Sequence, residues 1–243
     1  MNVLEIQSLS KSFGGLKAVN NVNLELRKGE ILGVIGPNGA GKTTLFNLIS
    51  GFIRPDKGSI QFLGQMIVGL QPYEICKLGL TRTFQIVKPF ANLSVIHNVV
   101  IGAFNRLSSR PTAEDRAREM IRFVGLERKA HFPANTLNIA ELKRLELAKA
   151  LATEPKLLLL DEVMAGINIA EREEIVQIIH QIRDNGVTIM IIGHEVQEIL
   201  KVADRLIVIN FGEKIAEGLP NDVICTKEVI EAYLGEEYKF VRA

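Results

Sequence analysis

The sequence predicts an α/β fold with a largely parallel sheet, and two observations support that prediction. Three apolar runs rich in Ile, Val and Leu are each followed by a loop and then by a segment with helical periodicity. Such runs suit strands covered on both faces, and their alternation with helices is typical of parallel sheets. A Gly-rich loop also separates the first run from its helix, where ligands of such sheets bind. The predicted strand and helix pairs are residues 31–35 with 42–50, 157–160 with 170–183, and 187–192 with 195–203.

The N-terminal region and the middle of the chain have different patterns. The segments 3–7, 22–26 and 59–62 predict antiparallel strands separated by turns. Strand signals disappear between residues 87 and 151, and helical patterns replace them at residues 95–103, 113–124 and 139–152, with a loop predicted at 108–111. We therefore predict an α/β core of residues 1–86 and 152–243 that carries an inserted helical subdomain, residues 87–151.

Composition excludes several classes of protein. The chain has 243 residues, of which 47% are hydrophobic and 23% charged, so it has enough apolar material for a sizeable core. A formal net charge of +1 provides no field that attracts nucleic acid, and we expect no nucleic-acid partner. Cys76 and Cys225 lie too far apart in the chain for a zinc motif, which favours reduced thiols in the cytosol. We find neither a signal-peptide pattern nor an apolar run near the ~20 residues of a membrane span.

The strongest functional signal is the phosphate loop, which we define as residues 36–44. It fits the pattern G-x-x-x-x-G-K-[ST] between a predicted strand and a predicted helix. Its glycines let successive N–H groups point at phosphate oxygens, and the helix adds the positive end of its dipole. Lys42 would contact the β- and γ-phosphates, and the Thr43 hydroxyl would ligate Mg²⁺. The predicted nucleotide-binding residues of the loop are Gly36, Pro37, Asn38, Gly39, Ala40, Gly41, Lys42, Thr43 and Thr44.

A second signal is the acidic pair Asp161–Glu162 at the end of the buried run 157–160. This position places both carboxylates at the ligand-binding edge of a parallel sheet. Asp161 is the predicted Mg²⁺ partner, through water, and Glu162 the predicted base for the attacking water. The alternative, a solvated loop start, loses weight once a phosphate loop is present in the same chain.

Three further residues are candidates on weaker grounds. His194 follows the third predicted strand, where it would contact the γ-phosphate and the catalytic water. Gln85 is a neutral side chain that would reach Mg²⁺ and the water from a loop. Phe13 precedes a Gly-Gly turn and either stacks on a base or packs in the core, with the sequence favouring neither.

In this order, the phosphate loop, Phe84–Gln85, Asp161–Glu162 and His194 resemble the nucleotide-binding subunits of ABC transporters over essentially the whole chain. The resemblance implies a P-loop ATPase core that binds ATP and Mg²⁺ and hydrolyses ATP to ADP and phosphate. It implies adenine stacking by Phe13, metal contact by Gln85, a catalytic base in Glu162, a switch histidine in His194 and a D-loop at residues 165–168. It also implies a second ATP-binding subunit and membrane permease subunits, which would place the chain at the cytoplasmic face of the membrane as a peripheral protein. The permease contact is expected on residues 85–103, with Phe84, Phe90 and Leu93 as candidates that core packing would explain equally well.

Three segments, residues 13–22, 79–85 and 231–236, look like the ATPases of branched-chain amino-acid importers. ATPases of urea or amide import and of lipopolysaccharide export share parts of this pattern. A small-molecule kinase, or an ABC ATPase acting on DNA or ribosomes, is a more distant alternative. Gln85, Asp161–Glu162 and His194 indicate that water accepts the phosphoryl group, which argues against a kinase. The sequence shows neither a second fused cassette nor a long coiled-coil insert, which argues against an ATPase acting on DNA or ribosomes.

One segment departs from the family pattern, which has L-S-G-G-Q before a helix of the subdomain. Here the altered signature segment is Leu137, Asn138, Ile139, Ala140 and Glu141. In the family this segment covers the γ-phosphate bound by the other subunit. The side chains of Ile139 and Ala140 would hinder close backbone approach, and Glu141 would add negative charge to an anionic site. A homodimer would weaken both of its sites in this way, so a heterodimer with a different ATP-binding subunit is expected.

Overall fold

The three strands predicted from apolar runs are all present in the computed structural model, which describes residues 1–193 and 195–233. The described chain divides into two compact units. Unit 1 contains residues 1–72 and the described residues from 188 onward, and unit 2 contains residues 73–187. The predicted division at residues 87 and 151 is a different partition and stays a prediction.

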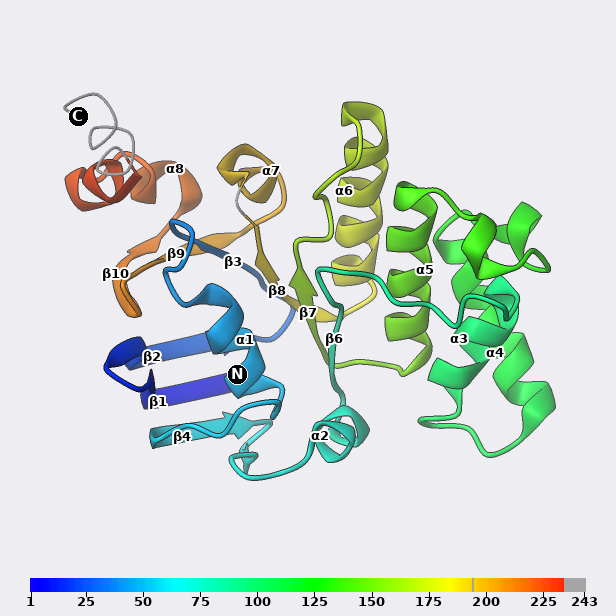
Figure 1. Cartoon of the computed structure of the whole chain (residues 1–243), viewed down its shortest axis with the longest axis horizontal. Helices are drawn as coiled ribbons and strands as arrows, with labels where there is room; N and C mark the ends of the chain where they lie inside the picture. The colour runs from blue at the N-terminus through cyan, green and yellow to red at the C-terminus, as the bar shows by residue number, and fades with distance from the viewer. Residues whose placement is uncertain (194, 234–243) are drawn as a thin grey trace. The chain divides into compact units, whose positions relative to one another are not determined.

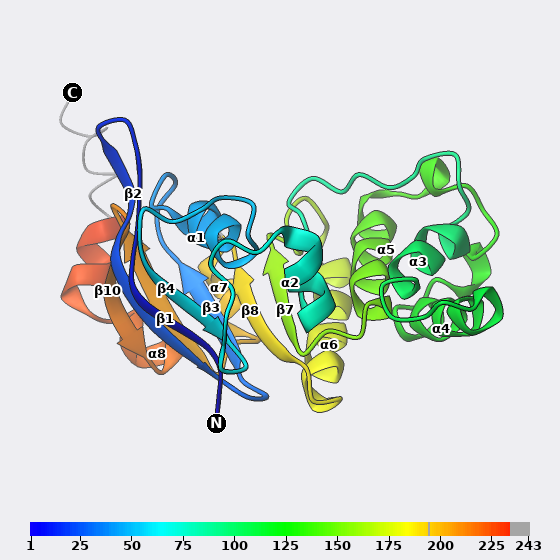
Figure 2. The same ribbon diagram turned by 90° about the horizontal axis from the view of Figure 1, so that it is seen from below.

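An antiparallel sheet forms the N-terminal part of unit 1, as predicted, although its strands are longer than the apolar segments suggested. The strand order is β2-β1-β4-β5, and Figure 1 and Figure 2 both show β1, β2 and β4 side by side. Leu4, Ile6 and Leu9 of β1 are buried, and pairing with β2 continues to Phe13. The strands are β1 (Asn2–Phe13), β2 (Leu16–Arg27), β4 (Lys57–Phe62) and β5 (Gln65–Met66).

The parallel strands of unit 1 support the phosphate loop. β3 (Ile31–Ile35) pairs in parallel with β8 (Thr188–Ile192) on one side and β9 (Arg205–Asn210) on the other. All residues of β3 and β8 are buried, which is why both read as continuous apolar runs. β10 (Glu213–Gly218) then pairs antiparallel with β9. The helices of this unit are α1 (Lys42–Ile49), α7 (Val196–Leu200) and α8 (Pro220–Val223), and residues 227–233 are also helical.

A half-buried ion pair ties β9 to the turn that precedes β3. Arg205 Nε and Nη2 donate to the two carboxylate oxygens of Glu30 at 2.6 and 2.9 Å. Burial alone would raise the pKa of Glu30, but the hydrogen bonds from Arg205 and from the Arg27 N–H hold that pKa below its ordinary value. The pair therefore stays charged near neutral pH and fixes the start of the strand that leads into the phosphate loop.

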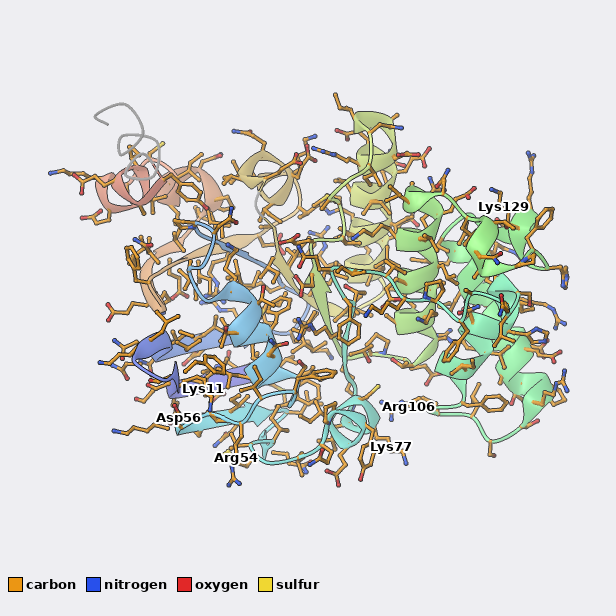
Figure 3. All side chains as sticks on the ribbon, in the orientation of Figure 1. Lys11, Arg54, Asp56, Lys77, Arg106 and Lys129 are labelled. Atoms are coloured by element: carbon orange, nitrogen blue, oxygen red, sulfur yellow. The ribbon has the colours of Figure 1, made fainter. Side chains whose placement is uncertain are left out.

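Unit 2 is mainly helical. Its two strands, β6 (Leu80–Arg82) and β7 (Leu157–Asp161), pair in parallel. Helices α3, α4 and α5 pack against one another, as both ribbon views show. Arg106 donates to the carbonyls of Lys77 and Thr153, so it ties the end of α2 to the end of α5 (Figure 3). The helices are α2 (Pro72–Leu78), α3 (Val95–Ala103), α4 (Arg110–Phe123), α5 (Ile139–Ala152) and α6 (Ile169–Asp184), with 3₁₀ turns at Glu127–Lys129 and Ala134–Thr136.

The helix predictions succeed best where the sequence provides a cap. α3 and α5 begin and end at the predicted residues, and Ser94 and Asn138 accept the capping hydrogen bonds at their starts. The loop predicted at residues 108–111 is wrong in its second half, because α4 begins at Arg110 with Pro111 in its first turn. Proline is tolerated there since that N–H has no partner within the helix. Across residues 1–193 and 195–233, every helix is too short or too polar to cross a bilayer.

Candidate functional site

The phosphate loop joins β3 to α1, and two of its glycines have conformations that other residues resist. Gly36 has a φ of 153° and Gly41 a φ of 105°. A Cβ atom on Gly36 would overlap the carbonyl oxygen of Ile209, and one on Gly41 would overlap that of Ala18. Close packing against neighbouring backbone therefore requires glycine at both positions, which accounts for the spacing recognised in the sequence.

Lys42 lies inside this loop. Its side chain is buried, and Nζ donates to the carbonyl oxygens of Gly36 at 2.6 Å and Pro37 at 2.8 Å. The ammonium is therefore held in the concavity of the loop. Gly41, the residue before α1, provides no capping side chain, and the first-turn N–H groups and the positive dipole end of α1 face back toward the loop. Together these groups form a cation and an amide array suited to phosphate.

Phe13 lies at the tip of the hairpin between β1 and β2, just before the Gly14–Gly15 turn. Its side chain is 48% exposed, so the core-packing alternative is not supported. Lys11 Nζ lies 5.6 Å from the centre of the Phe13 ring. The same ammonium pairs with Asp56 Oδ1 at 2.8 Å, and Figure 3 labels both residues of this pair. The exposed ring is thus available for stacking.

Asp161 ends β7 in unit 2, where its side chain is only 2% exposed. Oδ2 accepts a hydrogen bond from Arg82 Nη2 at 2.7 Å, while Oδ1 is buried without a hydrogen-bond partner among the described residues. A buried carboxylate oxygen without a partner is costly, and it is the kind of hard ligand that Mg²⁺ and its waters prefer. Asp161 therefore fits the metal role predicted for it.

Glu162 follows in an uncommon backbone conformation. Its φ is +50°, in the left-handed region, which costs a residue other than glycine about 1–3 kcal/mol. Gln85 Nε2 donates to Glu162 Oε2 at 2.6 Å. The structure therefore brings two predicted site residues into direct contact, and Gln85 bonds to the predicted base itself. Such strain is concentrated at functional positions, where the surrounding structure maintains it.

Two cations beside these carboxylates were not identified from the sequence. Arg82 pairs with Asp161 and lies 5.4 Å from the Phe84 ring. Lys143 in α5 is 6% exposed, and its Nζ donates to the carbonyls of Gln85 and Glu162. Burial lowers the pKa of Lys143, while the nearby carboxylates, Glu162 foremost, act in the opposite direction. The only sequence feature that could have identified Lys143 is its position, as a lysine, on the buried side of the predicted helix 139–152.

The altered signature segment begins α5 with a closed capping box. Asn138 Oδ1 accepts from the Glu141 N–H at 2.8 Å, and Glu141 Oε2 accepts from the Asn138 N–H at 3.0 Å. Glu141 Oε1 also pairs with Lys129 at 2.6 Å; Figure 3 labels this lysine. The negative charge expected at Glu141 is thus compensated by the ammonium of Lys129. Ile139, in contrast, is 57% exposed.

The same four residue types recur at the start of α6. Asn168–Glu171 repeats the sequence of Asn138–Glu141, and it closes the same capping box. The implied D-loop, residues 165–168, ends at Asn168, which is the capping residue of α6. The capping residues of α5 and α6 therefore accept hydrogen bonds with their side chains, whereas Gly41 at the start of α1 has no side chain to do so. The prediction for His194 lies outside the described residues.

Comparisons with known proteins agree with these features. A family model described as "ABC transporter" matches residues 19–165. The high-affinity branched-chain amino acid transport ATP-binding protein LivG of Escherichia coli K12 is 39% identical over 250 residues, covering 96% of this chain and 98% of that protein. An ATP-binding cassette of an ABC transporter in its ADP conformation has a TM-score of 0.88 at 30% identity, covering 97% of this chain and 99% of the other. A dimeric bacterial ABC transporter cassette has a TM-score of 0.81 at 25% identity, covering 89% and 98%. The predicted fold class is therefore confirmed.

Proposed function

The chain belongs to the ABC transporter family, and from that premise we propose that its ATP hydrolysis powers an importer of branched-chain or other hydrophobic amino acids. One observation supports this solute class above the others: the identity to the Escherichia coli amino acid transport protein extends over 96% of this chain. The kinase and nucleic-acid alternatives are not favoured, because the chain matches the ABC transporter model and because its similarity to a transport protein covers nearly the whole chain.

In the proposed chemistry, Lys42 and the amides of the phosphate loop hold the phosphates of ATP. Glu162 accepts a proton from the attacking water while Gln85 holds its carboxylate in place. Thr43, Gln85 and Asp161 would hold Mg²⁺, which would supply positive charge to offset that of the phosphates. His194 is the proposed γ-phosphate contact and Phe13 the proposed adenine contact.

The proposed permease contact lies on residues 85–103, with Phe84, Phe90 and Leu93 as its candidate side chains. Phe84, Phe90 and Leu93 are 42, 51 and 40% exposed, which argues against core packing for all three. Asn98 of α3 holds residues 90–94 from beneath: its fully buried amide accepts from the Phe90 N–H and donates to the Phe90, Leu93 and Ser94 carbonyls. An apolar surface on a fixed backbone suits docking to cytoplasmic segments of a membrane subunit, and it would place the chain at the cytoplasmic face of the membrane.

The proposed partner subunit is a second, different ATP-binding protein. Ile139 projects from the first turn of α5 with an exposed side chain, where the family pattern has a glycine that allows close backbone approach. This segment is therefore a poor cover for the partner's nucleotide. A partner with an intact segment would cover the nucleotide of this chain, so that one site per dimer retains full activity.

Uptake in the source organism tests the proposed solute. We expect deletion of the gene to abolish high-affinity uptake of labelled leucine, isoleucine and valine and to leave urea uptake unchanged. The wild-type gene restores leucine uptake, and a gene with Lys42→Ala does not. Loss of urea uptake with normal leucine uptake would assign the chain to another importer, and normal uptake of every solute would contradict the proposal.

Restoring the signature segment tests the asymmetry. In the complex with its partner, the combined change Asn138→Ser, Ile139→Gly, Ala140→Gly and Glu141→Gln is expected to raise nucleotide affinity at the site that this segment covers, and with it turnover. Glu141→Gln alone is the matched control, because glutamine retains the capping acceptor. Affinity and turnover that both stay at the wild-type level would count against a weakened site.

A further inference from the structure

Lys143 occupies an unusual position for a lysine. It lies in the second turn of α5 with its side chain buried, and its ammonium donates to the carbonyl of Gln85 at 3.1 Å and that of Glu162 at 3.0 Å. Both acceptors are main-chain oxygens, 58 residues upstream and 19 residues downstream of Lys143. One cation therefore joins the backbones of two residues that lie far apart in the sequence.

The side chains of those two residues are joined as well. Gln85 Nε2 bonds to Glu162 Oε2, so Lys143, Gln85 and Glu162 form a closed ring of hydrogen bonds. Glu162 is also the residue with the left-handed backbone conformation. Its carbonyl oxygen accepts a second hydrogen bond, from the Ala165 N–H at 3.1 Å. A charged donor on this carbonyl favours the peptide orientation that the left-handed conformation produces.

Packing alone does not explain a buried ammonium. Desolvation of a charge is costly, and a methionine of similar length would fill the same space without that cost. A lysine, unlike a methionine, donates directed hydrogen bonds here, and their acceptors are the carbonyls of Gln85 and Glu162.

We propose that Lys143 is a positioning residue, which fixes the peptide carbonyls of Gln85 and Glu162 and thereby orients the Glu162 carboxylate for turnover. The inference rests on the proposed role of Glu162 as the base. It adds a physical link from the altered signature segment, because Asn138 caps the same helix that carries Lys143. A movement of the start of α5 would therefore be transmitted to Glu162 through the Lys143 side chain.

Kinetics of the assembled transporter test this role. We expect Lys143→Met to lower kcat about tenfold to a hundredfold, since small displacements of catalytic groups have effects of this size, with KM and the Kd for MgATP unchanged. Lys143→Arg retains a cationic donor and is expected to recover most of the loss. In a Glu162→Gln background, Lys143→Met is expected to add no further loss, because both changes act through the same carboxylate.

Lys149→Met is the matched control: this lysine lies in the same helix and pairs with Glu146. If Lys143→Met shows no cooperative thermal transition, Lys143→Gln takes its place under the same criteria. A wild-type kcat, a parallel change in Kd and kcat without rescue by arginine, or a further loss in the Glu162→Gln background would each overturn the inference. Full turnover in Glu162→Gln alone would overturn the proposed base and this inference together.

Discussion

Replacement of Lys42 by alanine is expected to weaken nucleotide binding strongly at this chain's own site. The change deletes a buried ammonium that is held between the Gly36 and Pro37 carbonyls. A hydrogen bond to a charged group contributes about 1.5–3 kcal/mol, so loss of one such contact weakens binding about tenfold to a hundredfold. Titration of the purified chain with MgATP, followed by calorimetry, measures the effect.

Lys57→Ala is the control for that experiment, since Lys57 is an exposed lysine of β4 in the same unit. It removes the same charge from the chain, so a difference between the two variants reports on position rather than net charge. Wild-type affinity in Lys42→Ala would contradict the assignment of residues 36–44 as a phosphate loop.

Replacement of Glu162 by glutamine is expected to separate binding from turnover. Glutamine has nearly the same shape, and its carbonyl oxygen still accepts the hydrogen bond that Gln85 donates. It does not accept a proton, and loss of a general base lowers the rate about 10²–10⁴-fold. Phosphate release should therefore fall by this factor while the Kd for MgATP stays at the wild-type value.

Glu154→Gln provides a close control for the second experiment. Glu154 also has a left-handed backbone, with a φ of 54°, and it lies beyond the end of α5 in the same unit. The same substitution in the same conformation therefore tests backbone tolerance without touching the acidic pair. If Glu162→Gln releases phosphate at the wild-type rate, another group acts as the base.

Local patterns in the sequence determined the main elements and the ligand class. Continuous apolar runs predicted β3, β7 and β8 because strands buried on both faces need apolar residues at every position. The helical pattern predicted α5 at residues 139–152, and the structure adds that Asn138 caps its start. The phosphate loop could be recognised from the sequence because its glycines, its lysine and the start of its helix are close together in the chain.

Strands without such local signals were missed. β6 has three residues, and β10 is only partly buried, so neither has enough periodicity to be recognised. The apolar run of β9 resembles a short helix as much as a strand until its pairing with β3 is known.

The tertiary structure alone decided how the acidic pair is held. Arg82 reaches Asp161 across 79 residues of sequence, and Gln85 reaches Glu162 across 77. No periodicity encodes such partners, because they meet only when β6 and β7 pair and α5 packs beside them. The sequence by itself determined that this protein binds a triphosphate, and only the folded chain decided which side chains hold the acidic pair, since hydrogen bonds depend on distance in space rather than along the chain.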